Sequence, residues 1–201
     1  QPHIIGDSLS RFLDPVNKII QMPDIKIDWK KISKINLIAC GTSFYSCQVA
    51  TYWIEKIVGV SSTAHLASEF RYKPIVEKSD NVLSIFISQS GETADTLAAL
   101  KYAKNNKSKT LSLVNASESS IARESHFVIS IAAGPEIGVA STKAFTTQLI
   151  ALLLLTLSVR SLFVYRTSCR WASFIVFSLL IRYFALGRNT NCVMWLSVSL
   201  C

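Results

Sequence analysis

The segment VLSIFISQSGETADTL (82–97) gives the clearest indication of the fold. Its first seven residues, 82–88, form a largely apolar run of strand length that is typical of a buried strand. A tight turn around Gly91 follows, and from Glu92 onward the pattern becomes helical. A buried strand that leads directly into a helix predicts a parallel sheet whose strands are connected by helices.

The same alternation of strand and helix patterns extends to both sides of this stretch. Short apolar runs bounded by polar turns predict strands, and longer periodic segments predict the helices between them. We therefore expect an α/β fold with a five-stranded parallel sheet. The expected strands are 35–40, 62–67, 82–88, 110–115 and 127–132, and the expected helices are 44–59, 92–106, 119–124 and 142–158.

Composition narrows the classes of partner and cofactor. The 201 residues carry a formal net charge of +8, but the basic residues up to position 158 are interspersed with acidic ones. This is typical of a solvated surface, so we expect no nucleic-acid partner. The five cysteines form no CxxC pair. We therefore expect reduced thiols and no metal site, and, since the first residues do not resemble a secretion signal, a cytoplasmic protein.

The composition changes sharply after residue 158. All acidic residues lie at or before Glu136, whereas residues 159–201 contain arginine as their only charged residue type and three of the five cysteines. Our hypothesis is that this tail is the product of a different reading frame. A membrane-facing tail is the alternative, but the apolar run 174–181 ends at Arg182 and is shorter than the roughly 20 residues that a spanning helix needs, so we expect no membrane partner. The expected division is 1–29, a leading helix and linker; 30–158, the α/β domain; and 159–201, the tail.

Three polar loops are expected at one edge of the sheet, where ligands bind in open parallel sheets. They are residues 40–43, 88–93 and 138–143. Small residues, hydroxyl groups and helix N-termini together favour an anion, and we expect a phosphate. Ser43 can contribute if its strand is adjacent to strand 82–88. The candidate donors in the second loop are Ser88, Gln89, Ser90 and Thr93.

Each of these features also has a structural interpretation. A serine or threonine before a helix is usually only a helix cap, so the prediction depends on three such loops at one edge. Cys40 lies at a strand end without any evident histidine partner, and we interpret it as a buried small residue. His65 and His126 are interpreted as structural or surface residues.

Several segments, taken together, resemble the first sugar isomerase domain of the glucosamine-6-phosphate synthase family, the isomerising glutamine:fructose-6-phosphate aminotransferases. The resemblance covers roughly residues 30 to 156. It implies a flavodoxin-like, three-layer αβα sandwich that binds fructose 6-phosphate or glucosamine 6-phosphate. The segments are LIACGTSFYS (37–46), ASEFRY (67–72), SQSGETADTL (88–97), RES (123–125) and PEIGVASTKAFTTQL (135–149).

The resemblance also implies roles for individual residues. Ser43 and the second loop would hold the phosphate through Ser88, Gln89, Ser90 and Thr93. The sugar would face Thr42, Val139 and Ser141. No cofactor is implied, and the resemblance suggests a homodimer.

The family enzyme also has a glutaminase domain and a second isomerase domain that supplies the catalytic acid–base residues, and neither is expected in this chain. We therefore expect a fragment that is inactive by itself, and we assign no catalytic residue. Two alternatives remain open. The chain could be a non-catalytic phosphosugar sensor or module, or the inert remnant of a decayed gene.

Overall fold

The computed structural model describes residues 2–14, 16, 17, 19–23, 25–74, 81–131, 134 and 143–163. Its centre is a five-stranded sheet in the order β4-β3-β5-β6-β7, and every neighbouring pair is parallel. The expected α/β fold is thereby confirmed. The strands are β3 (Lys34–Ala39), β4 (Ser61–Leu66), β5 (Val82–Ser88), β6 (Lys109–Val114) and β7 (Phe127–Ser130).

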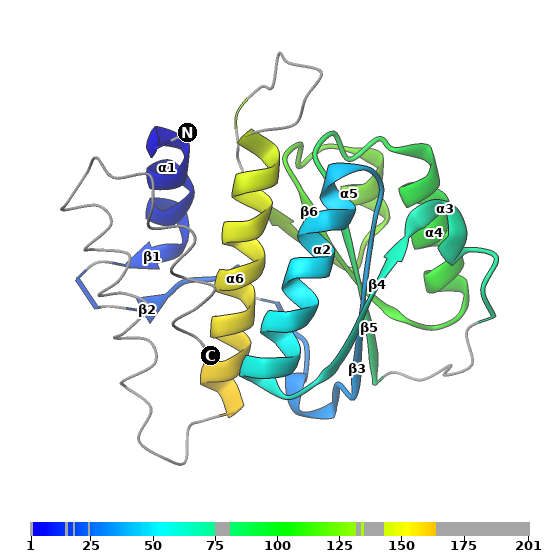
Figure 1. The fold of residues 1–201 in the computed structure, drawn as a ribbon, viewed down its shortest axis with the longest axis horizontal. Coiled ribbons are helices and arrows are strands. Elements are labelled where there is room, and N and C mark those ends of the chain that lie inside the picture. Colours follow the sequence, from blue (N-terminus) through cyan, green and yellow to red (C-terminus); the bar gives the residue numbers. More distant parts are fainter. Residues whose placement is uncertain are drawn as a thin grey trace.

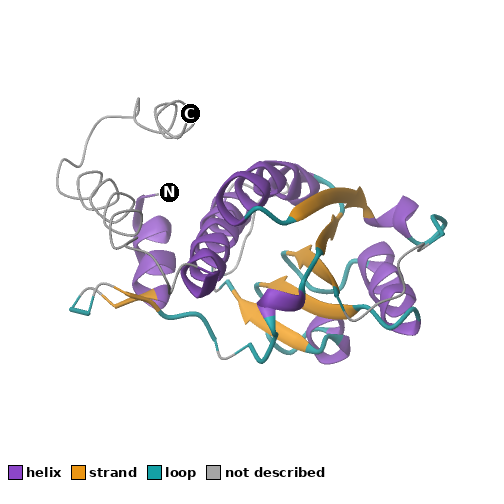
Figure 2. Cartoon of the chain, turned by 90° about the horizontal axis from the view of Figure 1, so that it is seen from below, coloured by secondary structure: helices purple, strands orange, loops and turns teal. Residues whose placement is uncertain are grey.

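Helices cover both faces of the sheet and give three layers (Figures 1 and 2). One face packs against α2 and α6, with α1 outside them, and the other face packs against the remaining helices. Alternate strand residues divide between two apolar cores, because successive side chains point to opposite faces. The helices are α1 (Pro2–Phe12), α2 (Thr42–Trp53), α3 (Ala67–Phe70), α4 (Ala94–Asn105), α5 (Ser120–Glu124) and α6 (Lys143–Phe163).

Strand β5 is the central strand, and all seven of its residues are buried. This explains its nearly continuous apolar sequence, since a strand covered by helices on both faces has no solvent side. Its neighbour β3 pairs in register, with Ala39 opposite Ile87. The loops that follow β3 and β5 therefore leave the same edge of the sheet side by side.

The N-terminal segment contains more regular structure than a helix and a linker. After α1, the short strands β1 (Leu13–Asp14) and β2 (Ile19–Ile20) pair antiparallel. The carboxylate of Asp14 accepts hydrogen bonds from the backbone N–H groups of Val16 and Asn17, at 2.9 and 3.0 Å. Such side-chain contacts replace backbone partners in a turn and stabilise the hairpin.

Helix α6 is long and apolar enough to cross a membrane by length and composition alone. It packs against α1 and α2, however, and its buried residues include Leu152 and Leu155 in the apolar core. A core helix passes the same length and composition test, and this packing makes α6 a core helix. The apolar run 174–181 lies outside the described residues.

Two shorter helical segments, a 3₁₀ turn η1 (Trp29–Lys31) and a π-helical turn η2 (Ile54–Val58), complete the described fold. The second continues α2 without a break to Gly59, whose φ of 80° ends the helix in the left-handed conformation.

Candidate functional site

The loop after β5 is a compact turn held by its own hydroxyl groups. Ser88 Oγ accepts a hydrogen bond from the backbone N–H of Gly91 at 3.0 Å and lies 3.1 Å from Thr93 Oγ1. Ser90 Oγ accepts from the N–H of Glu92 at 3.2 Å. Gly91 has a φ of 68°, a conformation that L-residues with a side chain adopt only at a cost. The turn thus gathers three hydroxyl groups within six residues.

The same loop is fastened to the segment that follows β6. The carbonyl of Gly91 accepts from the N–H of Ile121 at 3.0 Å, and Glu92 Oε1 accepts from the N–H of Ser120 at 2.7 Å. The hydrogen bonds from Ser120 lower the pKa of the Glu92 carboxyl below its usual value. Ser119 packs so closely on Gly91 that a side chain there would collide with it. The loop is therefore pre-formed by contacts from a second element.

Helix α4 begins directly after the loop, with Thr93 as its N-cap residue. The first N–H groups of a helix have no intrahelical acceptor, and the helix dipole places partial positive charge there. Ser88, Ser90 and Thr93 lie beside this end of a 12-residue helix. The arrangement suits an anion with several acceptor oxygens, such as a phosphate.

The neighbouring loop, after β3, repeats this geometry. Gly41 adopts φ 58° and ψ −137°, and the 12-residue helix α2 starts at Thr42. Thr42 is exposed, whereas the side chain of Ser43 is buried. Because β3 and β5 are adjacent and parallel, the N-termini of α2 and α4 lie at the same edge of the sheet. Ser43 thus lies at a second helix N-terminus beside the first one.

A buried glutamine that sequence reasoning did not select contacts Ser43. Gln148 of α6 is fully buried, and its Nε2 donates to Ser43 Oγ at 2.9 Å. Its Oε1 lies 3.3 Å from Ser46 Oγ, which also donates to the carbonyl of Ser43 at 2.7 Å. The available signal was an amide side chain within the apolar part of helix 142–158, where a buried polar group requires a partner.

The structure brings most of the predicted site residues to one edge and leaves others undescribed. Thr42 and Ser43 start α2, and the predicted donors of the second loop lie between β5 and α4. Val139 and Ser141 lie outside the described residues. Cys40 is partly buried, and its sulfur accepts from Thr96 Oγ1 at 3.8 Å. Within the described part of the chain, no group of three potential metal ligands occurs.

The two internal histidines have structural surroundings. His65 on β4 packs against Phe70, and burial, with smaller contributions from Lys73 and Lys34, lowers its pKa from 6.5 to about 4. His126 precedes β7, where the strands begin, so it lies at the edge opposite the loops described above.

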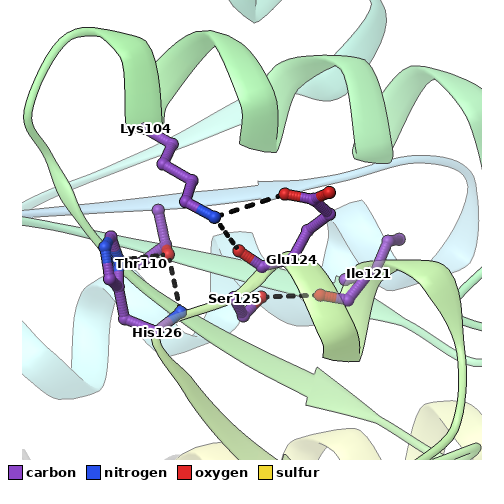
Figure 3. Close-up of polar contacts among 6 residues, drawn as sticks. All are labelled: Lys104, Thr110, Ile121, Glu124, Ser125 and His126. Atoms are coloured by element: carbon purple, nitrogen blue, oxygen red, sulfur yellow. Dashed lines mark hydrogen bonds and ion pairs between the residues drawn. The ribbon is translucent and has the colours of Figure 1, made fainter.

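Figure 3 shows the contacts around His126. Its Nδ1 accepts from the N–H of Thr110 at 3.2 Å and lies 2.8 Å from Thr110 Oγ1. Lys104 Nζ donates to the carbonyl of Glu124 at 3.0 Å and lies 3.3 Å from its carboxylate. Burial, and secondarily Lys104, lowers the pKa of His126. These contacts connect α4, α5 and the starts of two strands.

Comparison with known proteins identifies the family of the chain. The family model for the SIS domain matches residues 29–158. The glutamine–fructose-6-phosphate aminotransferase (isomerizing) of Bartonella quintana is 50% identical over 152 residues, and that of Zymomonas mobilis is 48% identical over 153 residues. Each alignment covers 76% of this chain and 25% of the relative. The chain thus spans about a quarter of the length of these curated relatives.

Solved structures give the same result. The C-terminal domain of glucosamine-fructose-6-phosphate aminotransferase from Francisella tularensis superposes with a TM-score of 0.76 and 40% identity, over 83% of this chain and 47% of that chain. A glucosamine-6-phosphate deaminase from Thermotoga maritima, at 19% identity and a TM-score of 0.62 over 93% of this chain and 58% of that one, shares the fold alone. The resemblance inferred from the sequence motifs is confirmed, and the chain belongs to the SIS domain family.

Proposed function

We propose that this chain binds a sugar phosphate, fructose 6-phosphate or glucosamine 6-phosphate, at the edge of the sheet where α2 and α4 begin. The observation that carries the proposal is the pairing of two hydroxyl-bearing helix N-termini on the adjacent strands β3 and β5. A phosphate has only acceptor oxygens at neutral pH, so it requires several convergent donors. Two helix dipoles and the hydroxyl groups around them supply these.

In this proposal some residues contact the phosphate group and others contact the sugar. Ser43 and the loop residues Ser88, Gln89, Ser90 and Thr93 hold the phosphate. Thr42, together with Val139 and Ser141, faces the sugar. The binding domain comprises residues 30–158, and residues 159–201 are a tail read in a different frame.

The names of the relatives suggest the wider role. The curated relatives are glutamine–fructose-6-phosphate aminotransferases. We infer that this chain corresponds to the sugar-phosphate-binding part of such an enzyme, acting in the cytoplasm as a homodimer without a cofactor. We assign it the binding step and no catalytic residue. A non-catalytic phosphosugar-binding module is the second candidate, because every group assigned here binds the ligand and none transfers a proton.

Titration calorimetry on the 201-residue chain tests the binding proposal. Fructose 6-phosphate and glucosamine 6-phosphate are titrated, with unphosphorylated fructose as the ligand control. Ser88→Ala should weaken sugar-phosphate binding by about tenfold, because one hydroxyl contact to a charged group contributes about 1.5 kcal/mol. Ser61→Ala, at an exposed position where β4 begins, is the matched control and should bind normally. A chain that melts cooperatively but binds neither sugar phosphate would refute the proposal.

A further inference from the structure

Gln148 contacts the proposed site from a helix that is remote in sequence. Its amide lies 105 residues from Ser43 along the chain and is fully buried, and it contacts Ser43 and Ser46 on α2. Other buried polar side chains of α6, Thr147 and Thr156, form hydrogen bonds to carbonyl groups of α6 itself. Gln148 differs from them in that its amide forms contacts with another helix.

The direction of the hydrogen bond to Ser43 determines what this serine can do. Gln148 Nε2 donates to Ser43 Oγ at 2.9 Å, so the serine oxygen acts as an acceptor in that contact. A serine hydroxyl has a single proton, and when its oxygen accepts from an amide, that proton is directed elsewhere. A phosphate oxygen can only accept, so Ser43 has to donate to it.

The opposite orientation of the amide would reverse these roles. If Oε1 faced Ser43, this oxygen would accept the serine proton. The lone pairs of Ser43 Oγ would then face the ligand and repel an anion. In the orientation that the structure gives, Nε2 donates to Ser43 Oγ at 2.9 Å, while Oε1 lies 3.3 Å from Ser46 Oγ, whose proton goes to the carbonyl of Ser43 at 2.7 Å. We propose that Gln148 is a positioning residue that fixes Ser43 as a hydrogen-bond donor to the phosphate of the ligand.

This inference rests on the proposed function. Three variants test the role of Gln148 separately from sugar-phosphate binding itself. Gln148→Met keeps the volume and removes both hydrogen bonds, and we expect fructose 6-phosphate affinity to fall about fivefold to tenfold. Gln148→Glu replaces the donor by an acceptor and adds negative charge, and we expect a loss on the order of a hundredfold. Thr156→Val removes a buried hydroxyl from the same helix away from Ser43 and should leave affinity unchanged.

A double-mutant cycle on affinity distinguishes positioning from general destabilisation. In the Ser43→Ala background, Gln148→Met should have almost no further effect, because the residue through which it acts is missing. A loss as large in that background as in the unchanged chain overturns the inference, as does unchanged affinity in folded Gln148→Met and Gln148→Glu. If the unchanged, folded chain binds no sugar phosphate, the proposed function fails and the inference falls with it. Chemical unfolding of each variant provides the check on folding.

Discussion

Replacing Gly91 with alanine perturbs the loop that connects β5 to α4 in two ways. The residue has a φ of 68°, in the left-handed region, where a Cβ atom is unfavourable. The new Cβ would also collide with the Cβ and Oγ atoms of Ser119, which is buried beside the loop. Ser119 Oγ donates to the carbonyl of Ala116 at 2.7 Å, so a displacement of the Ser119 side chain would also strain this hydrogen bond.

The two effects can be added to give an expected magnitude. Alanine in the left-handed conformation costs about 1 to 2 kcal/mol, and inserting a methyl group into a packed contact costs about 1 to 3 kcal/mol. We therefore expect Gly91→Ala to lower the free energy of unfolding by about 2 to 5 kcal/mol. Gly59→Ala is the matched control, since φ there is 80° and nothing lies within 4 Å of the added atom. Its expected cost is the conformational part alone, about 1 to 2 kcal/mol.

Urea unfolding followed by circular dichroism measures both variants on the 201-residue chain. The double variant Gly91→Ala with Ser119→Gly should recover part of the loss, because it removes the colliding side chain while the positive φ remains. If Gly91→Ala costs no more than Gly59→Ala, the reasoning about the close approach of Ser119 is refuted.

Three further predictions concern single side chains. Ser88→Ala should lower the free energy of unfolding by about 1 to 2 kcal/mol in urea titrations, because a backbone N–H and Thr93 lose a partner, and an unchanged midpoint would contradict this. The folded state disfavours protonation of His65, so the free energy of unfolding should decrease as the pH falls from 6.5 toward 4. In the His65→Phe variant, urea titrations over this pH range should show a smaller decrease, and an equal decrease in both proteins would exclude His65 as the cause. Lys104 forms an ion pair with Glu124, and both side chains are about 41% exposed. Lys104→Met should therefore change the free energy of unfolding in urea by less than about 1 kcal/mol, and a larger loss would show that the pair is more than a surface contact.

The three inner strands of the sheet could be predicted from sequence because they have little solvent contact. The buried runs of β3, β5 and β6 are short, apolar and bounded by polar turns, and each was expected within about one residue of its observed bounds. The short hairpin of β1 and β2 was not expected, since two-residue strands carry no periodic pattern. Helix α6 continues to Phe163, beyond the composition change at 158, and Val159 still packs in the apolar core of the sheet.

The candidate site was predictable in part for the same reason. Residues at strand ends and helix starts can be located once the strands are known, so the loop 88–93 and Ser43 were found. Whether β3 and β5 are neighbours could not be predicted from the sequence, since strand order depends on tertiary packing. Gln148 could not be assigned to Ser43, because a contact between residues 105 positions apart leaves no local signal.

The packing of α6 has a consequence for the order of folding. During synthesis the segment that contains β3, α2 and β5 precedes α6, yet α6 provides much of the apolar cover on that face of the sheet. Contacts between elements so distant in sequence form slowly, because the intervening chain loses conformational freedom when they close. Until α6 has emerged and docked, the nascent chain exposes the apolar side of α2, and the hydroxyl of Ser43 has no amide to orient it.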